Sequence, residues 1–105
     1  MSKIPRIKPT PKQAMEWVKE AGSGSRRLVF TESVESRLKR RRIARRQVLE
    51  TLKSGLVSEP LHQDELGDWR CAVSWFHAGA RLTVGVIFKT CDRGELAAVT
   101  SVLEE

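Results

Sequence analysis

The residues best suited to chemistry in this sequence form a run of cations in its first half. Between Arg37 and Arg46, seven of ten residues are basic and none is acidic. The whole chain has a formal net charge of +6, so its other residues together are close to neutral. A concentrated positive patch on a nearly neutral small domain is typical of proteins that bind the phosphates of nucleic acids. The cations are Arg37, Lys39, Arg40, Arg41, Arg42, Arg45 and Arg46.

Two other interpretations of this run stay open. The cations could dock an acidic partner protein, or they could form an ordinary solvated face. Arg37 and Arg41 are four residues apart and would share one face of a helix, so we expect these two to contribute most. A guanidinium at such a place could bind a backbone phosphate or stabilise the charge that develops at a phosphate being cleaved.

Acid–base chemistry has few candidates in this sequence. His62 and His77 are the only histidines, and histidine is the side chain that ordinarily titrates near neutral pH. Both fall in predicted loops, where a histidine is more often simply exposed. Neither has a spacing typical of metal ligands, and Cys71 and Cys91 show no CxxC or Cys/His pattern, so we expect two thiols in a reducing compartment.

The signatures of several protein classes are absent from the sequence. It has no glycine-rich phosphate loop, nucleophile elbow or metal-ligand cluster, so we expect neither a metal nor a cofactor. No apolar run approaches the roughly 18 residues of a membrane span, and the N-terminal residues lack the apolar core of a secretion signal. The expectation is a single cytoplasmic domain of 105 residues.

The elements that position the cations are two short helices. In one continuous helix, Arg41 and Arg45 would lie in the middle of the apolar face, so the periodicity predicts a break between Arg42 and Ala44. The first helix is predicted to start after an N-cap at Thr31 and to end near Arg41. The second follows Ala44, which lacks a capping oxygen, and ends at Gly55 as the residue after the helix. The cations then crowd the corner between the helices.

The N-terminal part is predicted to lie outside the main domain. Residues 1–9 read as an extended arm, and Thr10 to Gln13 form a capping box with proline at the first helical position. This helix should stop at Gly22, followed by a flexible Gly/Ser connection. We therefore divide the chain into an arm, helix and linker (1–25) and an α+β domain (26–105).

The second half alternates with period two and predicts antiparallel strands. The expected order is a short β-like run from Arg27, the two central helices, an edge strand at Leu56–Leu61 that contains Pro60, and three longer strands. Those strands are Asp68–His77, Arg81–Lys89 and Leu96–Leu103. We expect a three- to four-stranded antiparallel sheet with helices packed on one face.

Side chains on the two faces of this sheet have different predicted roles. Arg70, Arg81 and Lys89 lie opposite the apolar row, where they are either ordinary polar residues or part of an RNA-facing surface. Trp69 and Trp75 could stack on bases, but their phase favours the core. We expect eight residues to be buried: Leu38, Val48, Leu49, Leu52, Trp69, Val73, Val84 and Val86.

The central helices carry a resemblance to a known family. Residues 33–44 read SVESRLKRRRIA, and this stretch resembles the motif His-Ala-x-x-Arg-Met-x-x-Arg-Gly-Ile-Ser of a small domain-of-unknown-function branch of the RelE/ParE-like toxin superfamily. Arg37, Arg41 and Ile43 match the motif, and Leu38 matches in character. Ser33, Arg42 and Ala44 stand in place of the motif's histidine, glycine and serine. The resemblance covers roughly residues 28–102.

The resemblance implies a RelE-like fold and a toxin-type protein that binds RNA or DNA. Members of the wider superfamily include metal-independent endoribonucleases, in which the ribose 2′-hydroxyl attacks the adjacent phosphate, and gyrase poisons that cut nothing, and the fold alone does not choose between them. The resemblance also suggests an acidic antitoxin-like protein as a partner. Because Ser33 cannot transfer protons as histidine does, the acid or base would have to be His62 or His77, with Arg37 stabilising charge. We expect weak or absent cleavage. The alternative is a non-catalytic module that docks nucleic acid or an acidic protein.

Overall fold

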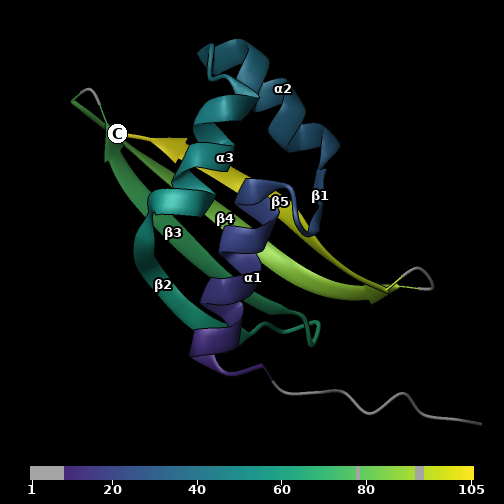
Figure 1. The fold of residues 1–105 in the computed structure, drawn as a ribbon. Coiled ribbons are helices and arrows are strands. Elements are labelled where there is room, and N and C mark those ends of the chain that lie inside the picture. The colour runs from purple at the N-terminus through teal and green to yellow at the C-terminus, as the bar shows by residue number, and fades with distance from the viewer. Residues whose placement is uncertain (1–8, 78, 92–93) are drawn as a thin grey trace, which may run out of the picture.

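The computed structural model describes residues 9–77, 79–91 and 94–105. Along the chain, a helix, a short strand and two helices are followed by a run of consecutive strands, which is an α+β order as predicted, and Figure 1 shows the arrangement. Residues 1–8 of the predicted arm lie outside the described residues. The elements are α1 (Pro11–Ser23), β1 (Arg27–Phe30), α2 (Glu32–Arg41), α3 (Arg45–Ser54), β2 (Leu56–Gln63), β3 (Trp69–His77), β4 (Ala80–Cys91) and β5 (Gly94–Glu104).

The strands form one five-stranded mixed sheet in the order β1-β5-β4-β3-β2. The pairs β2–β3, β3–β4 and β4–β5 are antiparallel, which confirms the predicted pairing of the last three strands. The predicted count of three to four strands, all antiparallel, needs correction because β1 pairs with β5 in parallel. This pair joins segments about 70 residues apart, and local periodicity carries no information about such a contact. Pro60 lies on the edge strand β2, as expected.

The break between the central helices is confirmed. Thr31 caps α2, accepting a hydrogen bond from the Val34 N–H at 3.3 Å. Arg42 then takes a left-handed conformation (φ 56°, ψ 41°), which turns the chain out of the helix, and the Ile43 N–H closes the turn on the Leu38 carbonyl at 2.9 Å. At the start of α3, the Gln47 side chain accepts a hydrogen bond from the Ala44 N–H at 2.7 Å.

Two glycines allow close approach of the backbone. Gly55 directly follows α3, as predicted, and takes an extended conformation. A Cβ there would lie 2.5 Å from the Thr51 carbonyl oxygen. Gly22 does not end α1, which continues to Ser23. A Cβ on Gly22 would lie 2.7 Å from the Leu49 carbonyl oxygen, so the glycine lets α1 and α3 pack closely.

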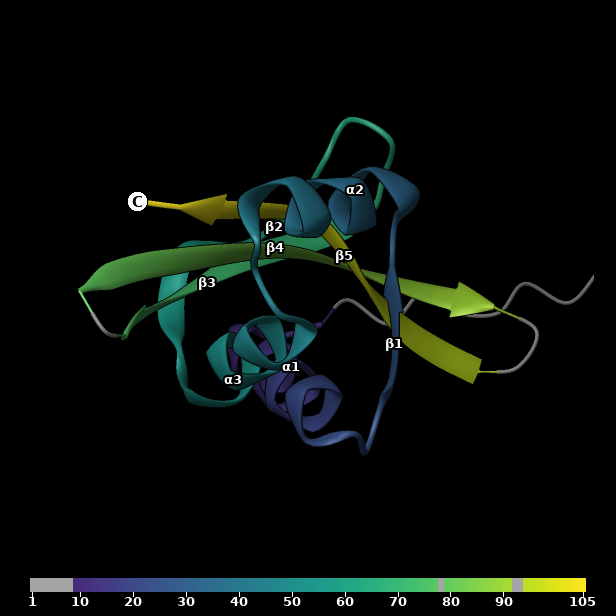
Figure 2. The same cartoon turned by 90° about the horizontal axis from the view of Figure 1, so that it is seen from above.

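The helices do not form a single layer. Figure 2 shows α1 and α3 side by side on one side of the sheet, with α2 set apart from them, over β5. Val18 and Ala21 of α1 belong to the same hydrophobic core as the central helices and the sheet, so α1 shares the core of residues 26–105. No helix among the described residues is long and apolar enough to cross a membrane.

Most of the predicted core is buried. Trp69 and Leu49 are only half-buried, which corrects the prediction for these two residues. The predicted residues that are buried are Leu38, Val48, Leu52, Val73, Val84 and Val86.

Candidate nucleic-acid interface

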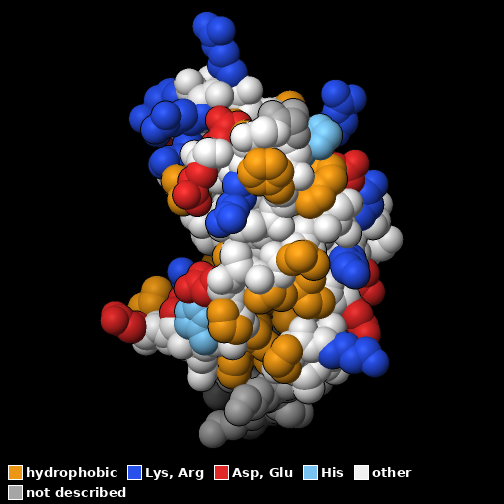
Figure 3. Space-filling view, turned by 90° about the vertical axis from the view of Figure 1, so that its left-hand side faces the viewer, with side chains coloured by type: hydrophobic (Ala, Val, Ile, Leu, Met, Phe, Trp, Pro, Cys, Tyr) orange, Lys and Arg blue, Asp and Glu red, His pale blue; other side chains and the backbone are white. Residues whose placement is uncertain are grey.

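The predicted cations gather where α2 ends and α3 begins, and we call the seven residues from Arg37 to Arg46 named above the arginine corner. Six of them are exposed, and Arg37 is half-buried. Lys39, Arg40 and Arg41 occupy the last turn of α2, where the helix dipole favours positive charge. Figure 3 shows Lys and Arg side chains massed at the upper end of the molecule, where Figure 1 places the turn between the two helices.

One member of the arginine corner has a structural role. Arg45 forms an ion pair with Glu35, and its guanidinium carbon lies 4.6 Å from the centroid of the Phe30 ring. These contacts tie α3 to α2 and to the end of β1. Within the part of the chain that the structure describes, none of the other six cations has an ion pair with a carboxylate.

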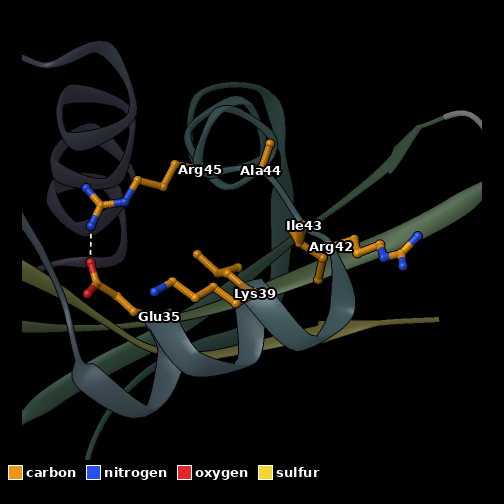
Figure 4. A pocket seen from close by; sticks show the side chains of 7 residues that line it. Glu35, Lys39, Arg42, Ile43, Ala44 and Arg45 are labelled. Carbon is orange, nitrogen blue, oxygen red and sulfur yellow. Dashed lines mark hydrogen bonds and ion pairs between the residues drawn. The ribbon is translucent and has the colours of Figure 1, made fainter.

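A pocket of about 580 Å³ opens between α2 and α3. Its apolar wall is made by Leu38 and Ile43, both buried. In Figure 4, Lys39 and Arg45 reach toward Glu35, whereas Arg42 points away from them, out of the pocket. The pocket therefore holds a mixed set of charges, and the guanidinium of Arg42 faces a different side of the arginine corner.

The turn between the helices contains two residues that do not suit their backbone positions. Arg42 is the only non-glycine residue with positive φ among the described residues, and that conformation ordinarily costs an L-residue about 1 kcal/mol or more. Ala44 is the N-cap of α3 but has no side-chain oxygen to accept a hydrogen bond from the first turn. The turn is thus less stable than a Gly and Ser pair would make it.

Two of the three cations predicted on the sheet form ion pairs, unlike most cations of the arginine corner. We call the face opposite α1 and α3 the open sheet face. On it, Arg70 forms an ion pair with Asp64 at 2.8 Å and Lys89 forms one with Asp68 at 3.6 Å. Arg81 is exposed and has no acidic partner within the described ranges. The structure therefore neutralises two of the three predicted sheet cations.

Asp64 organises the loop that supplies these carboxylates. Its Oδ1 accepts hydrogen bonds from the N–H groups of Leu66 and Asp68, each at 2.9 Å. Desolvation would raise the pKa of Asp64, but these backbone hydrogen bonds and the charge of Arg70 together hold that pKa below its ordinary value. The carboxylate that neutralises Arg70 is therefore ionised at neutral pH.

The two histidines lie in strands, not in the predicted loops. His62 is in β2, with Nδ1 3.0 Å from the Pro60 carbonyl oxygen and Nε2 3.8 Å from a Glu59 carboxylate oxygen. His77 ends β3, and its ring stacks on Trp75 with centroids 4.9 Å apart. His62 pairs with Arg70 across the sheet, so the two histidines are about 23 Å apart at roughly 3.3 Å per strand residue. They cannot serve one reaction centre together, and among the described residues their hydrogen bonds, ion pairs and ring contacts do not include Arg37.

The remaining candidates for chemistry are weak. Cys71 is buried as a free thiol, and desolvation, followed by the charge of Glu59, raises the pKa of this thiol to about 11. It is therefore unreactive at neutral pH. The side chain of Cys91 lies outside the described residues. Across the described ranges, no three His, Cys, Asp or Glu side chains gather where they could hold a metal ion.

Sequence patterns missed the stack of His77 on Trp75 and the loop carboxylates that pair with the sheet cations. Alternation places Trp75 and His77 on one side of β3, which was the available signal for the stack. Comparison of the chain with protein-family models, curated proteins and solved structures found no match.

Proposed function

We propose that this protein binds nucleic acid through the arginine corner. The observation that carries the proposal is that six of the seven cations have no carboxylate partner within the described part of the chain, although they crowd a single turn. Unpaired cations at such density repel one another, and a strand of phosphates removes that repulsion while releasing its own condensed counterions. An ordinary solvated face would intersperse acidic residues, as α1 and the end of α3 do.

The proposal includes a relationship to the RelE-like toxin-type proteins. The backbone at two positions that differ from the motif supports this relationship. At each of them the conformation is one that the motif's residue would favour, although this chain carries a different residue. Arg42 stands at the motif's glycine and adopts the left-handed conformation that glycine tolerates best. Ala44 stands at the motif's serine and is the N-cap of α3, a position that serine favours.

The form of the proposal that we favour is a binding protein whose RNA cleavage is weak or absent. Ser33 is exposed at the start of α2 and cannot act as an imidazole would. The two histidines are far apart, and their hydrogen bonds, ion pair and ring stack involve no member of the arginine corner. The described residues therefore supply electrostatic stabilisation of a phosphate but no positioned acid–base pair.

The test is titration of a fluorescent oligoribonucleotide at several salt concentrations. The variant Arg37→Ala/Arg41→Ala/Arg46→Ala removes three unpaired cations and should flatten the slope of log affinity against log salt by roughly 2 units. The control Lys12→Ala/Lys19→Ala/Lys53→Ala changes the net charge equally on exposed sites of α1 and α3 and should leave most of the slope intact.

Equal losses in the two triple variants would reduce the effect to net charge and contradict a localised site. If the wild-type protein does not bind at low salt, an acidic protein partner becomes the better explanation of the arginine corner. Incubation of a long RNA with the wild-type protein and with Ser33→His then tests cleavage. Strong cleavage by the wild type would contradict the binding-only form.

A further inference from the structure

The end of the β3–β4 hairpin carries exposed aromatic rings that the core does not use. The planes of His77 and Trp75 lie 13° apart with centroids separated by 4.9 Å, so the rings are stacked. Trp75 is half-buried, whereas His77 is exposed. The tryptophan therefore anchors the stack, and the histidine presents a planar ring to solvent.

A second aromatic residue at this end is also exposed. Phe76 retains 67% of its accessible surface, which is unusual for a phenylalanine in a strand. It pairs across the hairpin with Arg81, which is exposed and has no acidic partner in the described part of the chain. Phe76 and Arg81 lie on the open sheet face, whereas Trp75 and His77, one residue out of phase, lie on the face that carries α1 and α3. The hairpin end thus presents an aromatic ring on each face.

This aromatic end lies at the same end of the molecule as the arginine corner. Figure 1 shows the β3–β4 hairpin and the turn between α2 and α3 at the top of the molecule, and Figure 3 shows the same end from the side, rich in Lys and Arg. Arg42 points out of the α2–α3 pocket. A ligand held by the cations can therefore extend toward the exposed His77 ring at the end of the hairpin.

We propose that the nucleic acid bound by this protein is single-stranded and that its unpaired bases stack on the hairpin end, chiefly on His77. In a duplex the faces of the bases are already covered by their neighbours, whereas an unpaired base offers a free face to an aromatic ring. The phosphates of the same strand bind the arginine corner. This inference rests on the proposed function and names the class of its ligand.

Charge favours this occupant over an apolar protein segment. The exposed His77 ring lies at the same end of the molecule as the cations of the arginine corner, which suit a polyanion. Stacking also tolerates different bases, so the expected selectivity is for single strands over duplexes and not for one sequence.

The experiment compares three probes of equal length and backbone charge per strand: a single-stranded oligonucleotide, the same strand with abasic sites, and a duplex. At one fixed salt concentration, wild-type protein should bind the base-containing strand about tenfold tighter than the abasic strand. His77→Ala should remove most of this difference and leave the salt slope unchanged, because the stack does not neutralise a phosphate. His77→Phe should keep the difference, since it retains a planar ring.

Leu66→Ala is the matched control, because Leu66 is 87% exposed in the loop at the other end of the sheet. It should bind all three probes as the wild type does. Equal wild-type affinity for the base-containing and abasic strands would overturn the stacking inference while leaving binding at the arginine corner in place. Loss of binding to every probe at low salt would instead refute the proposed function itself. Preferred binding of the duplex would also overturn the inference.

Discussion

The cations of the arginine corner and of the open sheet face were both predicted to bind nucleic acid, but they differ in whether they have carboxylate partners. In the corner, six of seven cations lack a carboxylate partner in the described part of the chain. On the open sheet face, Arg70 and Lys89 are paired with Asp64 and Asp68. The two regions therefore have similar residue types but different available charge.

The difference shows that cations on one face of a sheet do not by themselves make an anion-binding surface. The β2–β3 loop folds back so that its aspartates reach the strands beside it. In the corner no loop does this, because α2 and α3 are joined by only three residues, Arg42 to Ala44. A cation that is already paired with a carboxylate adds less to the affinity for a polyanion than an unpaired one. The number of unpaired cations, more than the total number of cations, therefore decides where a polyanion binds.

The largest expected effect is that of reversing charge in the arginine corner. Arg40→Glu/Arg41→Glu should weaken oligonucleotide binding at low salt by about 100-fold or more, because two attractions become repulsions. Lys12→Glu/Lys19→Glu makes the same change in net charge on α1 and should cost much less. Fluorescence anisotropy measures both. Comparable losses would show that the corner is not a distinct site.

The second prediction concerns removal of the carboxylates that pair with Arg70 and Lys89 on the open sheet face. Asp64→Asn/Asp68→Asn leaves Arg70 and Lys89 without their carboxylates, so affinity for an oligonucleotide at low salt should rise several-fold. The salt slope should also steepen by roughly one unit. If binding is unchanged, the sheet face does not lie on the path of the ligand even when its charge is available.

A smaller effect is expected at Arg42. Arg42→Gly should raise the free energy of unfolding by about 1 kcal/mol, because glycine adopts the left-handed conformation without strain. The same variant should bind nucleic acid less tightly, since it removes an unpaired cation. Arg40→Gly is the matched control: it removes the same side chain from within α2 and should destabilise the protein by a similar amount. Denaturant titration of the three proteins distinguishes the signs.

The smallest expected effect is a pH dependence confined to the open sheet face. The folded-state pKa of Asp64 is below its ordinary value, so its contribution to stability is present above the unfolded pKa near 4. That contribution should be lost as pH falls through the lower folded-state pKa. Denaturation curves of wild type and Asp64→Asn should converge in this acidic window. A constant difference between them from pH 5 to pH 2 would contradict the assignment.

Local patterns predicted much of the fold because they report on local forces. Capping residues marked the start of α1 and of α2, and the position of Arg41 and Arg45 in the apolar stripe predicted the break between α2 and α3. Alternation predicted the β3–β4 hairpin. The same patterns could not predict that β1 joins β5 in parallel, that Gly22 lies inside α1, or that α1 shares the core, since each depends on contacts between distant segments.

Some features of the candidate site could likewise be predicted from the sequence, and others depend on tertiary contacts. The sequence by itself determined that seven cations lie at a corner between two helices and that the only histidines are at positions 62 and 77. Tertiary structure decided that Arg45 pairs with Glu35, that the sheet cations pair with the β2–β3 loop, and that the histidines lie far apart. Net charge and helix phase depend on neighbours along the chain, whereas the pairing of a charge depends on which loop folds beside it, and only the complete fold determines that.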